Sequence, residues 1–263
     1  MRARVFVLLL AVWSLAGCAV WRAPDMPTIA LVAPFEGQFR EIGYEALYAV
    51  RLGIADTDAQ VRLLAIDDGS TDDLAAARIE ALRNDASIVG VIALGVHASS
   101  EQAQAQLDGL PMVIAGYWDT EPLVNSTVIL ANSTLAKETL TFEDIMADND
   151  ADVSSDISGL SVMPALINSD ELTILSSGQL ATDTFRERYL ASDMFVPEPR
   201  HIATLVYDAT GILLTALQED IPLSTVTYAG LSGEIMFRDG YWQDAPVYRY
   251  RFGNDGTLVL SDD

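Results

Sequence analysis

The sequence predicts an α/β protein with a doubly wound parallel sheet, and three observations support this prediction. Short apolar runs alternate with amphipathic stretches over the first half of the chain. The run from Thr28 to Ala33 is almost entirely apolar, which is typical of a strand buried on both faces of a parallel sheet. The resulting rhythm of strand, helix, strand and helix favours right-handed βαβ units.

The elements of the first half are expected from local signals in chain order. Strands are predicted at 28–33, 61–66, 88–94 and 112–115, and helices at 39–54, 71–82 and 99–107. The first helix has apolar residues at helical spacing, among them Ile42, Leu47 and Val50. Thr71 or Asp72 is the expected N-cap of the second helix.

After residue 124 the alternation weakens. Short strands are expected at 128–130 and 172–175, helices at 135–146, 181–190 and 201–218, and period-two segments at 234–237 and 247–252. Residues 201–218 are apolar on more than one face, which predicts a buried helix. Turns are expected at Asp239-Gly240 and at 254–256.

The chain is strongly acidic and rich in hydrophobic residues. It has 38 acidic and 15 basic residues, a formal net charge of −23, and 50% hydrophobic residues. The hydrophobic content predicts a folded globular protein. The charge argues against nucleic acid and anionic lipid as partners, and we interpret it as a solubility feature. The single cysteine, Cys18, cannot form a disulfide within the chain.

The N-terminal segment has the features of a secretory signal. Arg2 and Arg4 precede an apolar run, Val5 to Val12, which is too short to cross a bilayer unaided. Leu15-Ala16-Gly17-Cys18 resembles the lipobox of bacterial lipoproteins, in which the cysteine becomes the first mature residue and carries lipid. This resemblance implies a signal peptide at 1–17, a lipidated Cys18 with a tether to residue 27, and a place outside the cytoplasm on a bacterial membrane, at its periplasmic face or the cell surface. An ordinary signal peptide with a coincidental cysteine is the alternative.

Four further segments together resemble the type I periplasmic binding proteins that serve ABC transporters for branched-chain amino acids and amides. They occur in the family's order: 29–37 leading into Ile42-Gly43-Tyr44-Glu45-Ala46, Leu64–Gly69 followed by Ala75-Ala76-Ala77, Val89–Ala93 followed by Ser99-Ser100, and Tyr207-Asp208-Ala209 followed by 233–237 and 245–248. The resemblance implies a first α/β lobe over 28–124 and a C-terminal segment, 195–263, that returns to it and adds closing strands. The intervening 125–194 is too short for the family's usual second lobe, which implies a reduced one.

This resemblance also implies a function. We expect a non-catalytic, solute-binding lipoprotein that passes an amino acid or a related small amine to an ABC permease. Its mechanism would be cleft closure, in which ligand contacts from both lobes stabilise the closed state. Because the second lobe is short, an accessory or scaffold lipoprotein that binds another envelope protein is the alternative, and it predicts an exposed apolar patch. A degenerate copy that binds no ligand is a third possibility.

The serine loop after the third strand is the first candidate binding site. In open α/β sheets, ligands bind beyond the carboxyl ends of the strands. Ser99 and Ser100 lie there, at the start of a predicted helix, and hydroxyls with helix N–H groups suit a carboxylate or another anion. Alternatively, Ser99 only caps the helix.

The second candidate is the loop after the fourth strand, which contains Tyr117, Trp118 and Asp119. Two aromatic rings and a carboxylate suit an amine or another cation. Phe35 and Phe39, in the loop after the first strand, are expected to line the same cleft. The alternative is that the aromatic rings fill the space left by the short second lobe.

Other chemistries are weakly supported by the sequence. The acidic runs 148–152 and 67–73 lack the glycine and glutamate spacing of a calcium loop, so no metal is expected. No phosphate loop, dinucleotide fingerprint or zinc spacing is present, so no cofactor is expected. A hydrolase triad of His97, Ser99 and Asp119 has no G-x-S-x-G turn to support it, so no catalytic residue is assigned.

Overall fold

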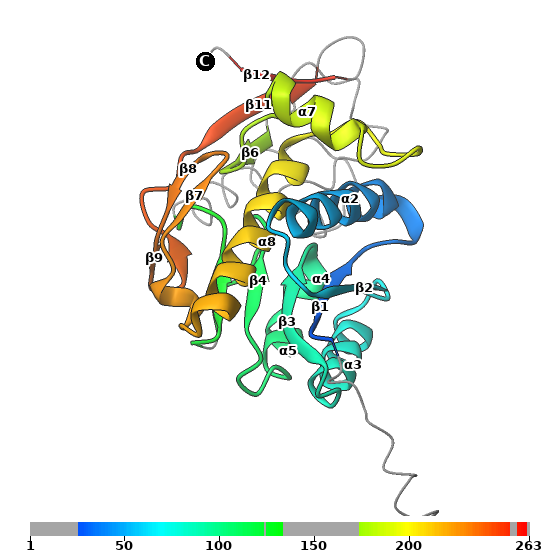
Figure 1. Cartoon of the computed structure of the whole chain (residues 1–263), viewed down its shortest axis with the longest axis vertical. Helices are drawn as coiled ribbons and strands as arrows, with labels where there is room; N and C mark the ends of the chain where they lie inside the picture. Colours follow the sequence, from blue (N-terminus) through cyan, green and yellow to red (C-terminus); the bar gives the residue numbers. More distant parts are fainter. Residues whose placement is uncertain (1–25, 124, 134–173, 253–256, 262–263) are drawn as a thin grey trace, which may run out of the picture.

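The computed structural model describes residues 26–123, 125–133, 174–252 and 257–261. A seven-stranded sheet in the order β2-β1-β3-β4-β5-β10-β9 forms its centre (Figure 1). The strands are β1 Thr28–Ala33, β2 Arg62–Asp67, β3 Ile88–Ala93, β4 Met112–Ile114, β5 Thr127–Ile129, β9 Phe237–Arg238 and β10 Tyr241–Trp242. All neighbouring pairs are parallel except β9 and β10, so the predicted α/β fold with a doubly wound, mostly parallel sheet is confirmed.

Helices cover both faces of this sheet. On one face α8, His201–Glu219, packs beside α2, Arg40–Asp56 (Figure 1). The other face has α3, Asp72–Arg83, with the short helices α4, Val96–Ser99, and α5, Glu101–Gln104. The chain winds outward in one direction from β1 to β2 and in the other from β3 to β5, so the switch point lies between β1 and β3.

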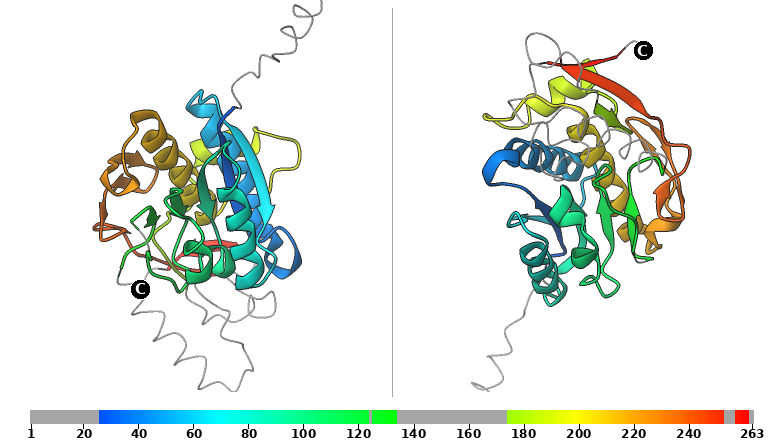
Figure 2. Two further views of the ribbon diagram at one scale, coloured as in Figure 1. Left: turned by 90° about the horizontal axis from the view of Figure 1, so that it is seen from below. Right: turned by 180° about the vertical axis from the view of Figure 1, so that it is seen from behind.

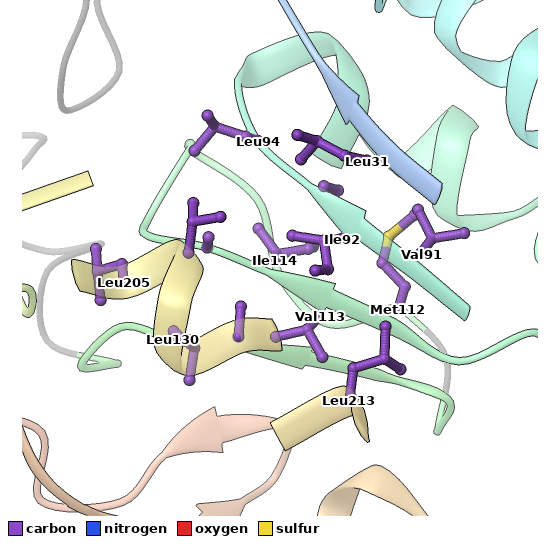
Figure 3. Packing of buried hydrophobic residues seen from close by; sticks show 14 of the residues in the cluster. Leu31, Val91, Ile92, Leu94, Met112, Val113, Ile114, Leu130, Leu205 and Leu213 are labelled. Atoms are coloured by element: carbon purple, nitrogen blue, oxygen red, sulfur yellow. The ribbon is translucent and has the colours of Figure 1, made fainter. Parts of the chain in front are cut away.

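The core lies between α8 and the sheet. Every residue of β1 is buried, as its apolar run predicts. Figure 3 shows Leu205 and Leu213 of α8 near Val113 of β4 and Leu130, the residue after β5. A Cβ at Gly90 would lie 2.7 Å from a methyl of Leu213, so glycine permits this close approach of helix and strand. The predicted buried helix at 201–218 is therefore confirmed.

A buried carboxylate joins α2 to the start of α8. The side chain of Glu45 is 1% exposed, and its Oε1 accepts the N–H groups of Arg200 at 2.7 Å and Ala203 at 2.9 Å. Its Oε2 lies 3.2 Å from Arg200 Nε. Burial raises the pKa of Glu45, and Arg200 opposes this effect. The carboxylate thus accepts two N–H groups at the start of α8, and these groups have no acceptor within the helix.

The predicted helix at 99–107 is wrong as a single element. The chain forms α4 and α5 instead, because Ser100 has extended backbone angles, φ −55° and ψ 156°, between them. Its hydroxyl accepts the N–H of Ala103 at 3.3 Å, so Ser100 begins a new helical turn. The predicted cap at Thr71 is confirmed, since its hydroxyl accepts the N–H of Leu74.

The C-terminal strands follow one side of the molecule. Figure 2 shows the orange and red segments beside the green strands of the central sheet. The hairpin β7–β8 consists of Tyr228–Gly230 and Gly233–Ile235, and a three-stranded sheet contains β6 Ile174–Ser176, β11 Tyr248–Phe252 and β12 Leu258–Leu260. The predicted turn at Asp239-Gly240 is confirmed, with φ of 52° and 80° between β9 and β10. The predicted single segment at 234–237 is divided between β8 and β9.

The described parts of 125–194 pack on elements of residues 28–124. Strand β5 pairs with β4, so the central sheet continues past residue 124. Helix α7, Asp183–Leu190, contributes Phe185 and Tyr189 to the main core, and Tyr189 donates to the Glu45 carbonyl. The predicted helix at 135–146 and the acidic run 148–152 lie outside the described residues, so a reduced second lobe stays a prediction. No helix among the described residues has the length and apolar character needed to cross a membrane.

Candidate ligand-binding cleft

A cleft lies at the carboxyl ends of β1, β2, β3 and β4, at the switch point of the sheet. It contains a larger pocket of about 450 Å³ and a smaller one of about 60 Å³, and both are lined by Val96 and Trp118. The larger pocket is also lined by Asp72, Ser100, Glu101, Gln102, Tyr117, Asp119, Thr120 and Glu121. The smaller pocket is also lined by Pro34, Phe39, Ile42, Asp68, Gly95 and His97. This is the position at which open α/β sheets bind ligands.

The loop after β1 is held in place by Asp67. Its Oδ2 accepts the N–H groups of Phe35 at 2.8 Å and Glu36 at 3.0 Å, and its Oδ1 lies 3.1 Å from Nη1 of Arg78. Partial burial raises the pKa of Asp67, but the hydrogen bonds that it accepts outweigh this effect and lower the pKa below its usual value. The loop therefore approaches the cleft in a fixed conformation, through η1, Gly37–Phe39.

The phenylalanines of this loop have different positions. Phe39 lines the smaller pocket, as expected. Phe35 lines neither pocket and packs edge-on against Tyr44, with ring centroids 5.8 Å apart. Phe35 is thus next to the cleft and not in its wall.

The loop after β3 turns sharply at Gly95. Its φ is +98°, and an added Cβ would lie 3.3 Å from Pro34 Cδ. Both observations favour glycine at this position. Directly after it, His97 Nδ1 lies 2.7 Å from Asp72 Oδ1, which joins the loop to the first turn of α3.

The structure separates the two serines of the predicted anion site. Ser99 is fully buried, and its hydroxyl donates to Gly95 O at 2.8 Å, so it is neither the cap nor part of the pocket wall. Ser100 lines the larger pocket, but its hydroxyl donates to His97 O at 2.9 Å while capping α5. Both hydroxyls are therefore engaged within their own loop.

The loop after β4 brings Tyr117, Trp118 and Asp119 into the larger pocket together, as predicted. The Trp118 indole is 2% exposed, and its N–H donates to Ala115 O at 2.8 Å. The Tyr117 hydroxyl lies 3.5 Å from Asp119 Oδ1, and burial raises the pKa of Tyr117, so its hydroxyl is neutral at physiological pH.

A buried amide keeps this loop in place. Gln104 Nε2 donates to Thr120 Oγ1 at 3.0 Å and to Glu121 O at 2.9 Å, and its Oε1 accepts the Leu123 N–H at 2.8 Å. The Thr120 hydroxyl donates to Ser99 O at 3.0 Å. The loops after β3 and β4 are thus held together, which fixes the aromatic wall relative to the rest of the cleft.

Several residues of the cleft were not expected as binding residues from the sequence. Among them, Asp68 and His97 line the smaller pocket and Asp72 lines the larger one. Asp67 and Asp68 are adjacent at a strand end. Successive side chains of a strand point to opposite faces of the sheet, so only one of the two is expected to face the cleft. The sequence does not indicate which one.

The geometry offers no support for the triad that the sequence left open. The Ser99 hydroxyl is bound to backbone carbonyls, and His97 Nδ1 lies against Asp72 instead of Asp119. Within the described ranges, no group of three or more histidine, cysteine, aspartate or glutamate residues is placed to hold a metal ion.

Comparison with known proteins gives a clear result for the fold. No protein-family model matches the sequence, and no curated protein matches it. A leucine-binding protein from Thermotoga maritima has a TM-score of 0.64 and 14% identity, with 89% of this chain and 97% of that chain covered. A periplasmic binding protein from Burkholderia mallei has a TM-score of 0.68 and 12% identity, with coverage of 90% and 94%.

The chain has the fold of the type I periplasmic binding proteins. A third similar structure is an extracellular ligand-binding receptor from Desulfohalobium retbaense, with a TM-score of 0.64 and 17% identity. That alignment covers 90% of this chain and 59% of the receptor, so the chain spans less than two thirds of the receptor's length. Of residues 28–124, which the sequence predicts as the first lobe, the structure describes all but residue 124.

Proposed function

We propose that this chain is an extracytoplasmic solute-binding lipoprotein that delivers an amino acid or a related small amine to an ABC transporter. The observation that carries the proposal is the cleft at the carboxyl ends of β1 to β4, which has an aromatic wall and loops fixed by buried hydrogen bonds. The solved structures of similar fold include solute-binding proteins. Cys18, which lies outside the described residues, would hold the protein at the membrane through its lipid.

The residues of the cleft would bind and orient the ligand without catalysis. Trp118 and Tyr117 provide apolar and π surface, and Asp119 provides a carboxylate at the rim. Asp68 provides a second carboxylate in the wall of the smaller pocket. Ligand contacts from both lobes would favour the closed state.

A thermal-shift screen of the purified protein tests this proposal. The compounds are amino acids, amides, polyamines and small carboxylates. A ligand at about 100 times its dissociation constant stabilises a fold by roughly 2.7 kcal/mol, which raises Tm by about 5–11 °C for a protein of this size.

Two variants test whether the ligand binds in the cleft. Gln102 is exposed and lines the larger pocket, so Gln102→Trp fills space there and is expected to abolish the shift. Ala105 is exposed and lines neither pocket, so Ala105→Trp should preserve it. Equal shifts in both variants would place the ligand elsewhere.

An accessory role in binding another envelope protein is the second candidate. It is favoured by Met194 and Phe195, whose side chains are 82% and 81% exposed next to each other. Such apolar exposure is typical of a contact surface when it is part of a larger patch. Unchanged Tm with every compound, on protein with a cooperative unfolding transition, would favour this role over solute binding.

A further inference from the structure

The residues that line the cleft give it a net negative charge. Asp72, Glu101, Asp119 and Glu121 line the larger pocket, and Asp68 lines the smaller one. No lysine or arginine is present among the lining residues that the structure describes. Carboxylates around a concave surface with apolar walls focus a negative potential into it, which attracts cations.

Asp68 distinguishes this cleft from an ordinary acidic surface. Its side chain is 2% exposed, and its Oδ1 accepts the Ser70 N–H at 2.9 Å. Its Oδ2 has no hydrogen-bond donor in the described part of the chain, and it lies toward Gly95, where an added Cβ would be 3.7 Å away. His97 and Arg78 are close enough for their charges to act on Asp68, but His97 is bound to Asp72 and Arg78 is paired with Asp67. A buried carboxylate oxygen beside a cavity is stabilised by a donor, and by a cationic donor most of all.

The dimensions and walls of the two pockets suit an ammonium group and an attached chain. A water molecule occupies about 30 Å³ in the liquid, so the smaller pocket of about 60 Å³ accommodates one small polar group. Phe39 and Trp118 line that pocket, and aromatic faces attract cations. The larger pocket, about 450 Å³, accommodates the rest of a small ligand beside Tyr117.

We infer that the cleft selects cationic amines that carry no carboxylate, with an ammonium group on Asp68 and the remainder of the ligand along Tyr117 and Trp118. This inference rests on the proposed function and narrows its ligand class from amino acids and amines to amines. The α-carboxylate of an amino acid would lie among Asp72, Asp119 and the other rim carboxylates without a basic partner in the described residues. A second ammonium group there is attracted by the same carboxylates, so diamines fit both pockets.

Isothermal titration calorimetry with two matched pairs of probes tests the inference. Cadaverine is lysine without its carboxylate, and tyramine is tyrosine without its carboxylate. We expect at least one amine to bind about tenfold or more tightly than its parent amino acid. A hydrogen bond to a charged group contributes about 1.5–3 kcal/mol, so Asp68→Asn should weaken that amine about 10- to 150-fold.

Control variants separate charge from folding. Asp73 is exposed on α3 and lines neither pocket, so Asp73→Asn should leave amine affinity within about twofold. If Asp68→Asn lowers Tm, the exposed rim residue Asp119 provides the test instead. Its φ of +53° is tolerated by asparagine, and Asp119→Asn should weaken amine binding about two- to fivefold.

The outcomes distinguish this inference from the proposed function. Lysine or tyrosine binding as tightly as cadaverine or tyramine would overturn the selectivity against carboxylates and leave solute binding intact. Amine binding that is unchanged in both Asp68→Asn and Asp119→Asn would overturn the assigned site. Binding of no amine and no amino acid would overturn the proposed function together with the inference.

Discussion

Removal of the Glu45 carboxylate should destabilise the whole fold. Glu45→Ala leaves the N–H groups of Arg200 and Ala203 without their acceptor at the start of α8 and removes the buried partner of the Arg200 guanidinium. A buried N–H group left without its acceptor costs about 1–3 kcal/mol, so the two groups together cost about 2–6 kcal/mol. The Arg200 side chain is 36% exposed, so its guanidinium adds little to this loss. For a protein of this size, we expect Tm to fall by about 4–24 °C.

The matched control is on the same helix. Glu41 has a side chain that is 77% exposed and lies 4.0 Å from Arg200, so Glu41→Ala should cost less than about 1 kcal/mol. Glu45→Gln keeps an oxygen for the two N–H groups and loses the charge, so its Tm should lie between those of the wild type and Glu45→Ala. Thermal unfolding at pH 7, followed by circular dichroism, measures Tm for all three variants. A loss in Glu45→Ala no greater than in Glu41→Ala would refute the role assigned to this carboxylate.

Three further predictions concern pH, the cleft and the membrane anchor. Burial raises the pKa of Asp208 to about 7, so the folded state holds this proton more tightly than the unfolded state does. The stability that the proton provides is therefore lost as pH rises from about 4 to 7. When pH is raised from 5 to 8 in calorimetric scans, the Tm of Asp208→Asn should therefore fall less than that of the wild type. Asp220→Asn, at an exposed position, should show the same fall in Tm as the wild type. Gly95→Ala, at φ +98° and against Pro34, should lower stability by about 1–2 kcal/mol in urea titrations, and a neutral result would contradict the turn described for β3. Cys18→Ser should move the protein from the membrane to the soluble fraction after cell fractionation, and retention at the membrane would argue against the lipid anchor.

Much of the fold could be predicted because its signals are local. The apolar run of β1 and the apolar faces of α8 mark elements that are buried, and burial is what the sequence pattern reports most directly. The Asp239-Gly240 turn was predictable because both residues need positive φ. The break at Ser100 was not, since serine before a helical segment predicts a cap but does not fix which of two adjacent serines provides it.

The site was predictable in part. Tyr117, Trp118 and Asp119 follow a strand and are near one another in sequence, so their meeting in one pocket needed no knowledge of tertiary structure. Asp68 and the pair formed by His97 and Asp72 depend on which strands are neighbours and on which side a strand-end residue faces. Ser99 lies outside both pockets, and its hydroxyl satisfies a carbonyl of its own turn, a local alternative open to any serine in a helix.

The most direct test of the account is whether a small amine binds in the cleft, and tryptophan fluorescence measures this. Trp118 lines both pockets and Trp242 lies in β10 outside them, and each is 2% exposed, so Trp118→Phe and Trp242→Phe form a matched pair. Titration with the tightest-binding amine is expected to change the emission of the wild type and of Trp242→Phe, and to leave that of Trp118→Phe nearly unchanged. A full response in Trp118→Phe would contradict the cleft as the binding site.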